Sequence, residues 1–505
     1  MVIQSDKHRQ KTIKRPLIRQ RSRLYAAHSQ IVLCGVMMQS KDRVANMLKT
    51  LRIQNFKAWK DTGEIRLAPI TVFFGGNSAG KTSLLQFLLM LKQTAESSDR
   101  RRVLNTGDSY TPVELGTFRD LIFEHDTKRK LEFQVSWSTP EPIRFSDSLH
   151  ATNYRGDQID FSGSIIAQEE VQLVEFFEYK LLDAGKETAS VRFSRFGAKP
   201  KEYKLVSTSY NLKRIQGRAW PLPPPTRFYG FPEEVQAYYQ NATFANDLVL
   251  ALEQQLKKLK YLGPLRDIPK RNYAWAGDAP EHVGNDGDGV IEALLAGAHR
   301  KISRGVNKKA YPFQEVVAGW LKRLGLLESF EAKRIARNRK EYEVRVRTPN
   351  SREDVDLPDV GFGISQVLPV VVESFYVAHN STVIIEQPEL HLHPRVQTEL
   401  ADLFIEAIHS RENGKDRAVQ FIIESHSEHF LQRLQRRVAE GELDPSEVAL
   451  YFCESDPKGS VLRELKVNLL GEIDNWPEDF FGDPMEDLYQ RMEASAQKAV
   501  EGPSK

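Results

Sequence analysis

The chain has 505 residues, 40% hydrophobic and 28% charged, and is therefore long enough to form several domains with buried cores. It has no run of about 18 or more apolar residues, so no membrane span is expected. Its two cysteines exclude a disulfide framework or a cysteine-rich zinc site. The net charge is +3, but residues 1–46 hold ten basic and two acidic side chains, leaving 61 basic and 66 acidic ones elsewhere. This balance gives no case for a large nucleic-acid surface, and we expect a cytoplasmic protein.

The basic segment 1–46 has two interpretations. One is an arm that binds nucleic acid or anionic lipid. We favour the other, a disordered N-terminal extension or a stretch that is not normally made. The reason is that Met47 begins a segment that reads as a natural first strand.

The segment after Met47 predicts three strands. Residues 50–56 alternate between apolar and polar side chains, and 64–67 alternate again after a turn at 61–63. Ile70–Phe74 is a short apolar run rich in β-forming residues, which is typical of a buried strand.

A phosphate-binding loop follows this buried strand. Gly75-Gly76-Asn77-Ser78-Ala79-Gly80-Lys81-Thr82 matches G-x-x-x-x-G-K-[ST] without a gap and precedes a predicted helix at Ser83–Leu91. Its glycines let backbone N–H groups turn toward phosphates, and the helix N-terminus adds positive charge. We expect Lys81 to reach the β- and γ-phosphates of ATP and the Thr82 hydroxyl to bind Mg²⁺. The predicted cofactor-binding residues here are Gly75, Asn77, Ser78, Ala79, Gly80, Lys81, Thr82 and Ser83.

The middle of the chain changes from strand-rich to helical. Residues 110–215 are mostly strand-like, and a proline-rich break follows at 221–225. Helical patterns cover about 232–260 and 289–326, and 328–347 predicts a hairpin.

From residue 366 onward, helices and strands alternate. Helices are predicted at 366–378, 394–410 and 427–440, and strands at Thr382–Ile385 and Val419–Ile423. Such alternation predicts a parallel sheet with helices packed on it.

Residues with a chemical role follow both of these strands. The first strand ends in Glu386, and P-loop enzymes use a carboxylate at this place to hold Mg²⁺ opposite the loop hydroxyl. Glu386 is therefore a predicted metal ligand together with Thr82. His426 follows the second strand, where a histidine can hydrogen-bond the γ-phosphate and sense its loss. The alternatives are an exposed glutamate at a strand end and a surface histidine at a helix N-terminus.

Two further sequence patterns suggest a metal ion, but neither has the ligands or spacing of a known metal site. His391 and His393 have no third ligand evident nearby, so packing or a subunit contact is favoured over zinc. The acidic, glycine-rich segment 284–289 fails the spacing of a calcium-binding EF-hand and is expected to be a loop.

Together these segments resemble the ABC-type and AAA P-loop ATPases of the OLD, RecF and SMC-like group. The resemblance is closest to bacterial members with a DUF3696-type tail, and it covers roughly residues 48–485. The segments that carry it are the opening strand 50–57, the signature segment 361–369, the Walker B strand and D-loop 385–394, and two further stretches at 261–266 and 471–477.

The resemblance implies an α/β fold, a P-loop NTPase head of the ABC type with a mixed sheet. It implies β-rich and helical insertions between the P-loop and the signature segment. The expected parts are the extension 1–46, the N-terminal part of the head with a β-rich lobe (47–230), a helical insertion (231–335), the C-terminal part of the head (336–450) and a tail (451–505) that is frayed over 486–505.

In ABC-type heads the signature segment contacts the γ-phosphate bound by a partner subunit. The resemblance therefore implies a homodimer or higher oligomer assembled around ATP, with Gly363 and Ser365 making that contact. The alternative is a glycine-rich helix start that only packs. One departure is Phe362, which occupies the usual serine position.

The second departure concerns catalysis. ABC-type hydrolases place a catalytic glutamate directly after the metal-binding carboxylate, where this chain has Gln387. An amide cannot act as the general base. Either Glu389 replaces it, or hydrolysis is slow and the ATP-bound state long-lived. The predicted catalytic set is Glu386, Gln387, Glu389 and His426. The Q-loop is sought at 114–120.

The resemblance also suggests a role. It implies an ATPase that regulates a separately encoded effector, such as a nuclease or toxin, in anti-phage defence or DNA maintenance. DNA binding stays open, no membrane partner is expected, and the chain after residue 440 is too short for the Toprim nuclease domain of OLD proteins. The alternatives are a non-hydrolysing ATP-bound scaffold and, less favoured, a transporter ATPase subunit.

Overall fold

The structure is a computed structural model. It describes residues 47–147, 152–197, 202–216, 220–336, 339–349, 351–361, 363–477 and 491–492. The expectations for 1–46, for Phe362 and for most of the tail 486–505 lie outside these residues. Within the described part of the chain, no helix is both long enough and apolar enough to cross a membrane.

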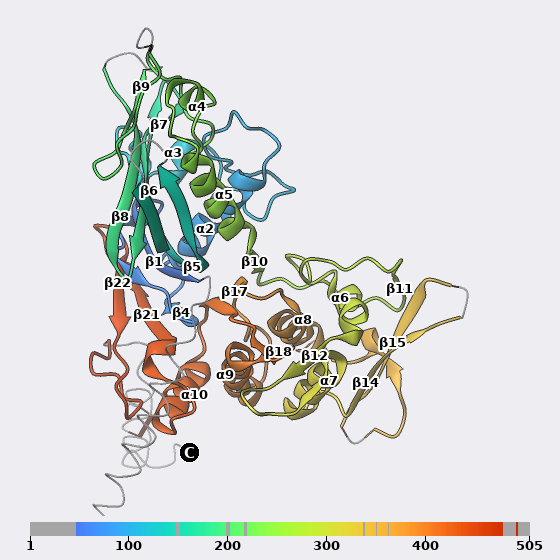
Figure 1. The fold of residues 1–505 in the computed structure, drawn as a ribbon. Helices are drawn as coiled ribbons and strands as arrows, with labels where there is room; N and C mark the ends of the chain where they lie inside the picture. The colour runs from blue at the N-terminus through green and yellow to red at the C-terminus, as the bar shows by residue number, and fades with distance from the viewer. Residues whose placement is uncertain are drawn as a thin grey trace, which may run out of the picture. The chain divides into compact units, whose positions relative to one another are not determined.

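A large antiparallel sheet is built from strands early in the chain (Figure 1). Its order is β2-β1-β5-β6-β7-β8-β9, with β3 paired to β1. The strands are β1 (Leu48–Phe56), β2 (Trp59–Asp61), β3 (Ile65–Arg66), β5 (Leu131–Asp147), β6 (Thr152–Gln168), β7 (Val171–Asp183), β8 (Lys186–Arg195) and β9 (Tyr203–Val206). The strand-rich character predicted for 110–215 is confirmed.

A second sheet is mixed and has six strands. Its order is β10-β17-β20-β4-β21-β22, and only the pairing of β21 with β22 is antiparallel. The strands are β10 (Leu259–Leu262), β17 (Thr382–Glu386), β20 (Gln420–Glu424), β4 (Ile70–Gly75), β21 (Val448–Glu454) and β22 (Val461–Leu465). The α/β fold with a mixed sheet that the sequence predicts is confirmed.

The inner strands of this mixed sheet are buried on both faces. Ile384 and Ile422 belong to the core that also contains the antiparallel sheet and α2 (Lys81–Glu96). Their neighbours Val383 and Ile423 point into the core on the opposite face. Because side chains alternate along a strand, continuous apolar runs are required wherever helices or other layers cover both faces.

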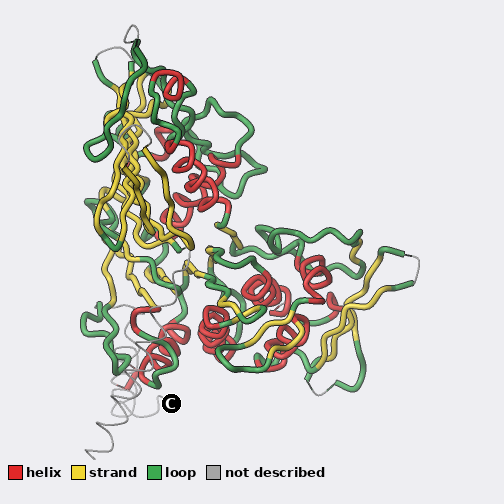
Figure 2. Tube along the Cα trace, in the orientation of Figure 1, coloured by secondary structure: helices red, strands yellow, loops and turns green. Residues whose placement is uncertain are grey.

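The remaining helices fall into two groups (Figure 2). Against the antiparallel sheet lie α3 (Phe118–Leu121), α4 (Glu234–Tyr238) and α5 (Phe244–Lys257), with the 3₁₀ turn η1 (Phe123–His125). The second group comprises α6 (Val290–Ala296), η2 (Gly297–His299), α7 (Phe313–Arg323), α8 (Gly363–Tyr376) and α9 (Pro394–His409). Helix α10 (Glu428–Ala439) packs on α9, and the turns η3 (Leu357–Asp359) and η4 (Pro445–Glu447) complete the set.

Two small sheets accompany the second helix group. One contains β11 (Tyr273–Ala274), β14 (Ser329–Arg334), β15 (Glu341–Arg347) and β16 (Val355–Asp356). The other contains β12 (Lys301–Ser303), β13 (Ala310–Pro312), β18 (Arg411–Glu412) and β19 (Lys415–Asp416). The hairpin predicted at 328–347 is confirmed as β14 and β15.

Two helix predictions were wrong in part. The pattern at 232–260 breaks after Lys257, and β10 begins at Leu259, where alternate side chains enter the two cores on either side of the mixed sheet. The pattern at 289–326 is interrupted by the β12–β13 hairpin, whose turn contains Gly305 at φ +149. At β10 tertiary burial outweighs local helix propensity, whereas the β12–β13 hairpin is largely exposed and the helical pattern ends there at the turn with Gly305 and at the extended backbone of Pro312.

A buried glutamine joins the two large sheets. The side chain of Gln420 is fully buried. Its Nε2 donates to the carbonyl oxygens of Leu48 at 2.9 Å and Ala68 at 3.1 Å, and its Oε1 accepts from Leu48 N at 3.2 Å and Thr382 Oγ1 at 3.0 Å. A buried polar side chain with all of these bonds fixes the position of β1 against the mixed sheet.

Gln420→Leu is expected to lower the free energy of unfolding by about 3 kcal/mol, because it leaves the backbone groups of Leu48 and Ala68 buried without partners. Denaturant unfolding followed by circular dichroism measures the change. Gln432→Leu, on the exposed side of α10, is the matched control. Equal unfolding midpoints for the two variants would contradict this role.

Candidate functional site

Segments far apart in the sequence meet at the carboxyl edge of the mixed sheet. Glu386 at the end of β17 pairs in register with Glu424 at the end of β20, and Glu424 pairs with Phe73 on β4. The loop that follows β4 is the predicted phosphate-binding loop. In open parallel sheets ligands bind at this edge, so the register alone brings the predicted site together.

The phosphate-binding loop has a backbone that requires its glycines. Gly75 has φ +139, and a Cβ at this position would lie 2.2 Å from the carbonyl oxygen of Cys453 on β21. Gly80 has φ +91, and its missing Cβ leaves room for the Trp59 indole nitrogen at 3.0 Å. A side chain at either position would shift the loop or the strand against it.

The start of helix α2 is fixed by a tryptophan from β2. Trp59 Nε1 donates to Ser83 Oγ at 2.9 Å and to the Gly80 carbonyl at 3.1 Å, and Ser83 Oγ donates to that carbonyl at 2.6 Å. Lys81 Nζ donates to the carbonyls of Gly75 at 3.0 Å and Gly76 at 2.7 Å. The lysine amine therefore lies over the loop. The Ser83 hydroxyl bonds to Trp59 and to the Gly80 carbonyl, and so helps to fix the start of the helix.

A pocket of about 330 Å³ opens beside this loop. It is lined by Lys57, Ala58, Asn77, Ser78, Ala79, Gly80, Lys81, Thr82, Ser83, Gln86, Gln387, Glu424 and His426. The predicted residues 77–83 thus gather around one cavity with Gln387 and His426. Gly75 lies just before the lining segment, as the turn that directs the loop over the strand end.

Glu424 is the carboxylate that contacts the loop hydroxyl. Thr82 Oγ1 donates to Glu424 Oε1 at 3.0 Å, and Lys81 Nζ lies 4.0 Å from the same oxygen. Glu424 is only 2% exposed, and burial raises the pKa of its carboxyl, opposed by the Thr82 hydrogen bond and the Lys81 charge.

Glu386 lies one strand farther from the loop, and its carboxylate has different partners. Its Oε1 accepts from the Tyr261 hydroxyl at 3.0 Å, and its carbonyl oxygen accepts from Arg266 Nη2 at 3.2 Å. Burial, and then the charge of neighbouring Glu424, raise the pKa of Glu386 to about 7. Two electrostatically coupled carboxyls therefore occupy adjacent strand ends.

The residues after Glu386 turn back toward the pocket. Gln387 has φ +44, and its N–H donates to the Glu424 carbonyl at 2.8 Å, which directs its side chain to the pocket wall. Glu389 is buried, and its Oε1 accepts from His426 N at 2.6 Å. Burial raises the pKa of Glu389, whereas burial and the Lys81 charge lower the pKa of His426. A neutral imidazole at the pocket can donate one hydrogen bond and accept one.

The signature residues lie apart from this pocket. Gly363 begins α8, with the carbonyl of His391 and the side chain of Leu392 about 4 Å from where its Cβ would be. Neither Gly363 nor Ser365 is among the described residues that line the pocket. His391 and His393 are exposed, and His393 Nδ1 accepts from Arg395 N at 3.3 Å as the N-cap of α9. The start of α8 therefore lies beside residues 391–392 of the same chain and outside the pocket lining. The segment 114–120, where a Q-loop was sought, also lies outside the pocket lining.

The donor set around Thr82 fits Mg²⁺ rather than a softer metal. It consists of a hydroxyl and carboxylates, and one buried oxygen, Glu424 Oε2, has no hydrogen-bond partner among the described residues. No cluster of three or more His, Cys, Asp or Glu side chains within the described ranges is arranged to hold a metal alone. Mg²⁺ in P-loop sites takes few protein ligands, with phosphate and water completing its shell.

Four residues that line the pocket are not among the predicted site residues: Lys57, Ala58, Gln86 and Glu424. Lys57 Nζ donates to Gln86 Oε1 at 2.7 Å on one wall, and Glu424 forms the floor beside Thr82. Glu424 had a detectable signal, because Ile-Ile-Glu occurs twice, at 384–386 and 422–424, each time at the end of a predicted strand. Lys57 and Gln86 carry no such pattern.

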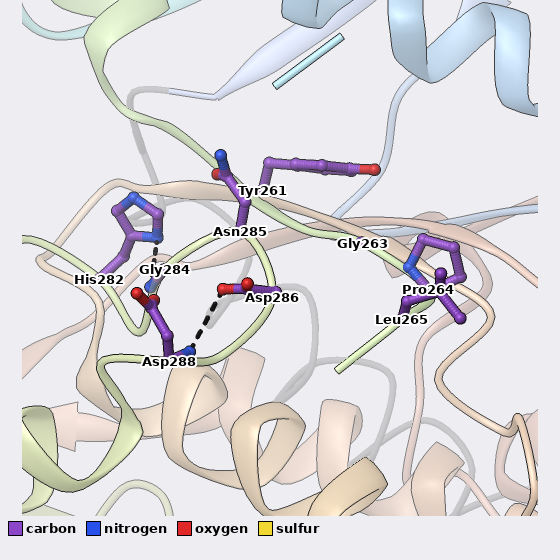
Figure 3. Close-up of a pocket in the computed structure, with 9 residues that line it drawn as sticks. All are labelled: Tyr261, Gly263, Pro264, Leu265, His282, Gly284, Asn285, Asp286 and Asp288. Atoms are coloured by element: carbon purple, nitrogen blue, oxygen red, sulfur yellow. Dashed lines mark hydrogen bonds between the residues drawn. The ribbon is translucent and has the colours of Figure 1, made fainter. Parts of the chain in front are cut away.

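A larger pocket, of about 530 Å³, lies at the end of β10 and the residues that follow this strand (Figure 3). It is lined by Tyr261, Gly263, Pro264, Leu265, His282, Gly284, Asn285, Asp286 and Asp288. Burial lowers the pKa of His282 to about 4, and its Nδ1 accepts from Gly284 N at 3.1 Å. Next to this loop, the fully buried Glu373 of α8 accepts from Val283 N at 3.0 Å. Tyr261 lines this larger pocket and donates from its hydroxyl to Glu386 Oε1 at 3.0 Å.

Glu373 is expected to make stability depend on pH. Burial raises its pKa from 4.5 to about 8, so the folded chain holds a proton that the unfolded chain loses. The stability this provides is complete below about pH 4.5 and is lost progressively as the pH rises from there through 8, a change on the order of 5 kcal/mol. Glu373→Gln should therefore raise the unfolding temperature at pH 8 more than at pH 5, as measured by differential scanning calorimetry. The exposed Glu331→Gln is the control, and an equal effect of Glu373→Gln at both pH values would contradict the shift.

Comparison with solved structures gives distant matches. The SMC head domain from Thermotoga maritima is 10% identical, with 83% of this chain and 99% of that chain covered and a TM-score of 0.36. An Smc head domain with an extended coiled coil bound to the C-terminal domain of ScpA, derived from Pyrococcus furiosus, is 10% identical over 89% and 99%, with a TM-score of 0.41. The SmcHead bound to the C-winged helix domain of ScpA is 11% identical over 83% and 98%, with a TM-score of 0.39. The comparison with curated proteins returns no match.

Family models give a broader match. The model described as AAA ATPase domain matches residues 47–212 and 300–431, and Protein of unknown function (DUF3696) matches residues 443–490. The first match contains the phosphate-binding loop and both glutamate-ending strands, and it supports ATP binding. The second contains β21 and β22. The chain therefore belongs to the AAA ATPase domain family and carries a DUF3696 segment.

Proposed function

We propose that this chain is a Mg²⁺-dependent ATPase with slow turnover, which dimerises around nucleotide and so regulates a partner. The observation that carries the proposal is the pocket of the P-loop. Lys81, Thr82, a buried carboxylate and His426 surround one cavity at the carboxyl edge of the mixed sheet. Family membership supports the nucleotide, and the site geometry supports the divalent ion.

Each pocket residue has a role that follows from its position. The N–H groups of the loop and the start of α2 bind the phosphate chain, and Lys81 exchanges its loop carbonyls for phosphate oxygens. When bound, Mg²⁺ neutralises charge on the transferred phosphoryl group. His426 donates a hydrogen bond toward the γ-phosphate, and Trp59 keeps the helix start rigid.

Gln387 is the reason to propose slow hydrolysis. Its side chain lines the pocket at the position where a general base is expected, and an amide cannot accept the proton of the attacking water. Glu389 supplies a nearby carboxylate that does not line the pocket; its Oε1 accepts from the backbone of His426, and its Oε2 is buried without a hydrogen-bond partner among the described residues. The second candidate function, a non-hydrolysing ATP-bound scaffold, rests on the same observation.

Dimerisation is proposed from the position of the signature segment. Gly363 and Ser365 lie in the first turn of a helix outside their own pocket, and in this proposal Gly363 completes the pocket of a second copy, whereas Ser365 is buried in the single chain. ATP held between two copies would then set the lifetime of the dimer. We extend the proposal to a separately encoded effector, such as a nuclease or toxin in anti-phage defence, on the family resemblance of the motifs.

Lys81→Ala is expected to weaken ATP binding by about tenfold or more, because a hydrogen bond to a charged phosphate is lost. Titration of a fluorescent ATP analogue measures the affinity, and phosphate release measures turnover. Lys322→Ala, an exposed lysine on α7, is the control. Unchanged ATP affinity in Lys81→Ala would overturn the assignment of this pocket. Binding without any phosphate release in the wild type would favour the scaffold.

Gln387→Glu is expected to raise the rate of phosphate release by about 100-fold, since it supplies the missing general base. The same change should shorten the lifetime of the ATP-induced dimer, which light scattering detects as a doubled mass. Gln236→Glu, at an exposed position on α4, is the matched control. A wild-type protein that stays monomeric with saturating ATP would refute dimerisation, and an unaltered rate in Gln387→Glu would refute the explanation for slow turnover.

A further inference from the structure

Two strands of the mixed sheet end in the same tripeptide, Ile-Ile-Glu. The register sets Glu386 directly beside Glu424, so two carboxylates share one sheet edge. P-loop ATPases require one such carboxylate opposite the loop hydroxyl. The structure therefore offers two candidates for a single role, and their contacts differ.

The contacts of the loop hydroxyl favour Glu424. Thr82 Oγ1 donates to Glu424 Oε1 at 3.0 Å, and Glu424 lines the P-loop pocket. Glu386 is not among the described residues of that lining, and its Oε1 is held by the Tyr261 hydroxyl at 3.0 Å. A bond from this tyrosine, which is itself buried, orients Glu386 toward β10 rather than toward the loop.

The second carboxylate oxygen of Glu424, Oε2, has the capacity to bind a ligand. Oε2 is buried without a hydrogen-bond partner among the described residues, although the whole side chain is only 2% exposed. An unpaired carboxylate oxygen in such a place is costly unless a cation or donor binds it. The Lys81 amine is 4.0 Å from Oε1 and is expected to move to phosphate when nucleotide binds. A divalent cation would then supply the positive charge that Lys81 no longer provides beside Glu424.

We propose that Glu424 supplies the protein carboxylate for the Mg²⁺ of the site, together with Thr82 Oγ1, and that Glu386 supports it from the neighbouring strand. The proposal rests on the proposed function, since it concerns the same nucleotide pocket. It assigns the metal-facing role to the strand next to β4 instead of to the strand that carries the motif Glu-Gln-Pro-Glu. Tyr261 and Arg266 hold Glu386 in its supporting position.

The first test measures metal binding without relying on turnover. Mn²⁺ replaces Mg²⁺, and its affinity for the protein saturated with a non-hydrolysable ATP analogue is measured by electron paramagnetic resonance. Glu424→Gln should weaken Mn²⁺ binding by about tenfold or more, and Glu386→Gln should weaken it less. Glu428→Gln, four residues along the chain, is the matched control. Nucleotide affinity without metal should not fall in Glu424→Gln, because the change removes a negative charge near the phosphates.

Replacing the carboxylate by a cysteine thiolate distinguishes a metal ligand from a residue that only orients Thr82. Cys is a soft ligand that prefers Cd²⁺ over Mg²⁺. Glu424→Cys should therefore bind Cd²⁺ with the ATP analogue more tightly than the wild type does, and Glu386→Cys should show no such gain. The wild type also contains buried Cys453, so it corrects for that thiol.

The results separate this inference from the proposed function. If the wild type binds neither the ATP analogue nor Mn²⁺, the proposed function itself fails. If the wild type binds both and Glu424→Gln retains full Mn²⁺ affinity, the proposed function stands and the role of Glu424 is refuted. A Cd²⁺ gain in Glu386→Cys but not in Glu424→Cys would return the metal-facing role to Glu386.

Discussion

The parallel pairing of β17, β20 and β4 is the constraint on which the rest of the site depends. These strands are continuous apolar runs because a core covers each face of the mixed sheet. A slip of one residue in β20 would move the buried Gln420 away from its partners Leu48, Ala68 and Thr382, so these hydrogen bonds fix the register. That register places Glu386 beside Glu424, and Glu424 beside the end of β4. The positions of the carboxylates at the phosphate-binding loop thus follow from the burial of these strands together with the buried hydrogen bonds of Gln420.

Packing of this kind has an electrostatic consequence. Burial raises the pKa values of Glu386, Glu389 and Glu424. Lys81 lies 4.0 Å from Glu424, and its charge opposes the shift there. Neighbouring carboxylates in a low-dielectric place favour either protonation or a bound cation. The left-handed backbone of Gln387 adds local strain of the kind found at functional sites. A divalent cation would compensate the negative charge of the carboxylates at this edge.

Helix α8 contacts two separate parts of the molecule, the segment at residues 391–392 and the loop of the larger pocket. It begins at Gly363 next to the D-loop, and its buried Glu373 holds Val283 in the loop of the larger pocket. Tyr261 joins that larger pocket to Glu386. The DUF3696 match contributes β21, which pairs with β4 and closes over Gly75. The DUF3696 segment is therefore part of the sheet that carries the phosphate-binding loop.

The sequence by itself determined the local chemistry of this protein. The strand, glycine turn and helix around Lys81 are specified by residues close in the chain, because the loop geometry depends on Gly75 and Gly80 themselves. The alternation after residue 366 likewise predicts the parallel strands and the helices between them. Tertiary structure alone decided that β10 and β21 extend the sheet and that Glu424 contacts Thr82. Those features depend on which strands become neighbours and in what register, and pairings between residues hundreds of positions apart leave no periodic signal in one sequence.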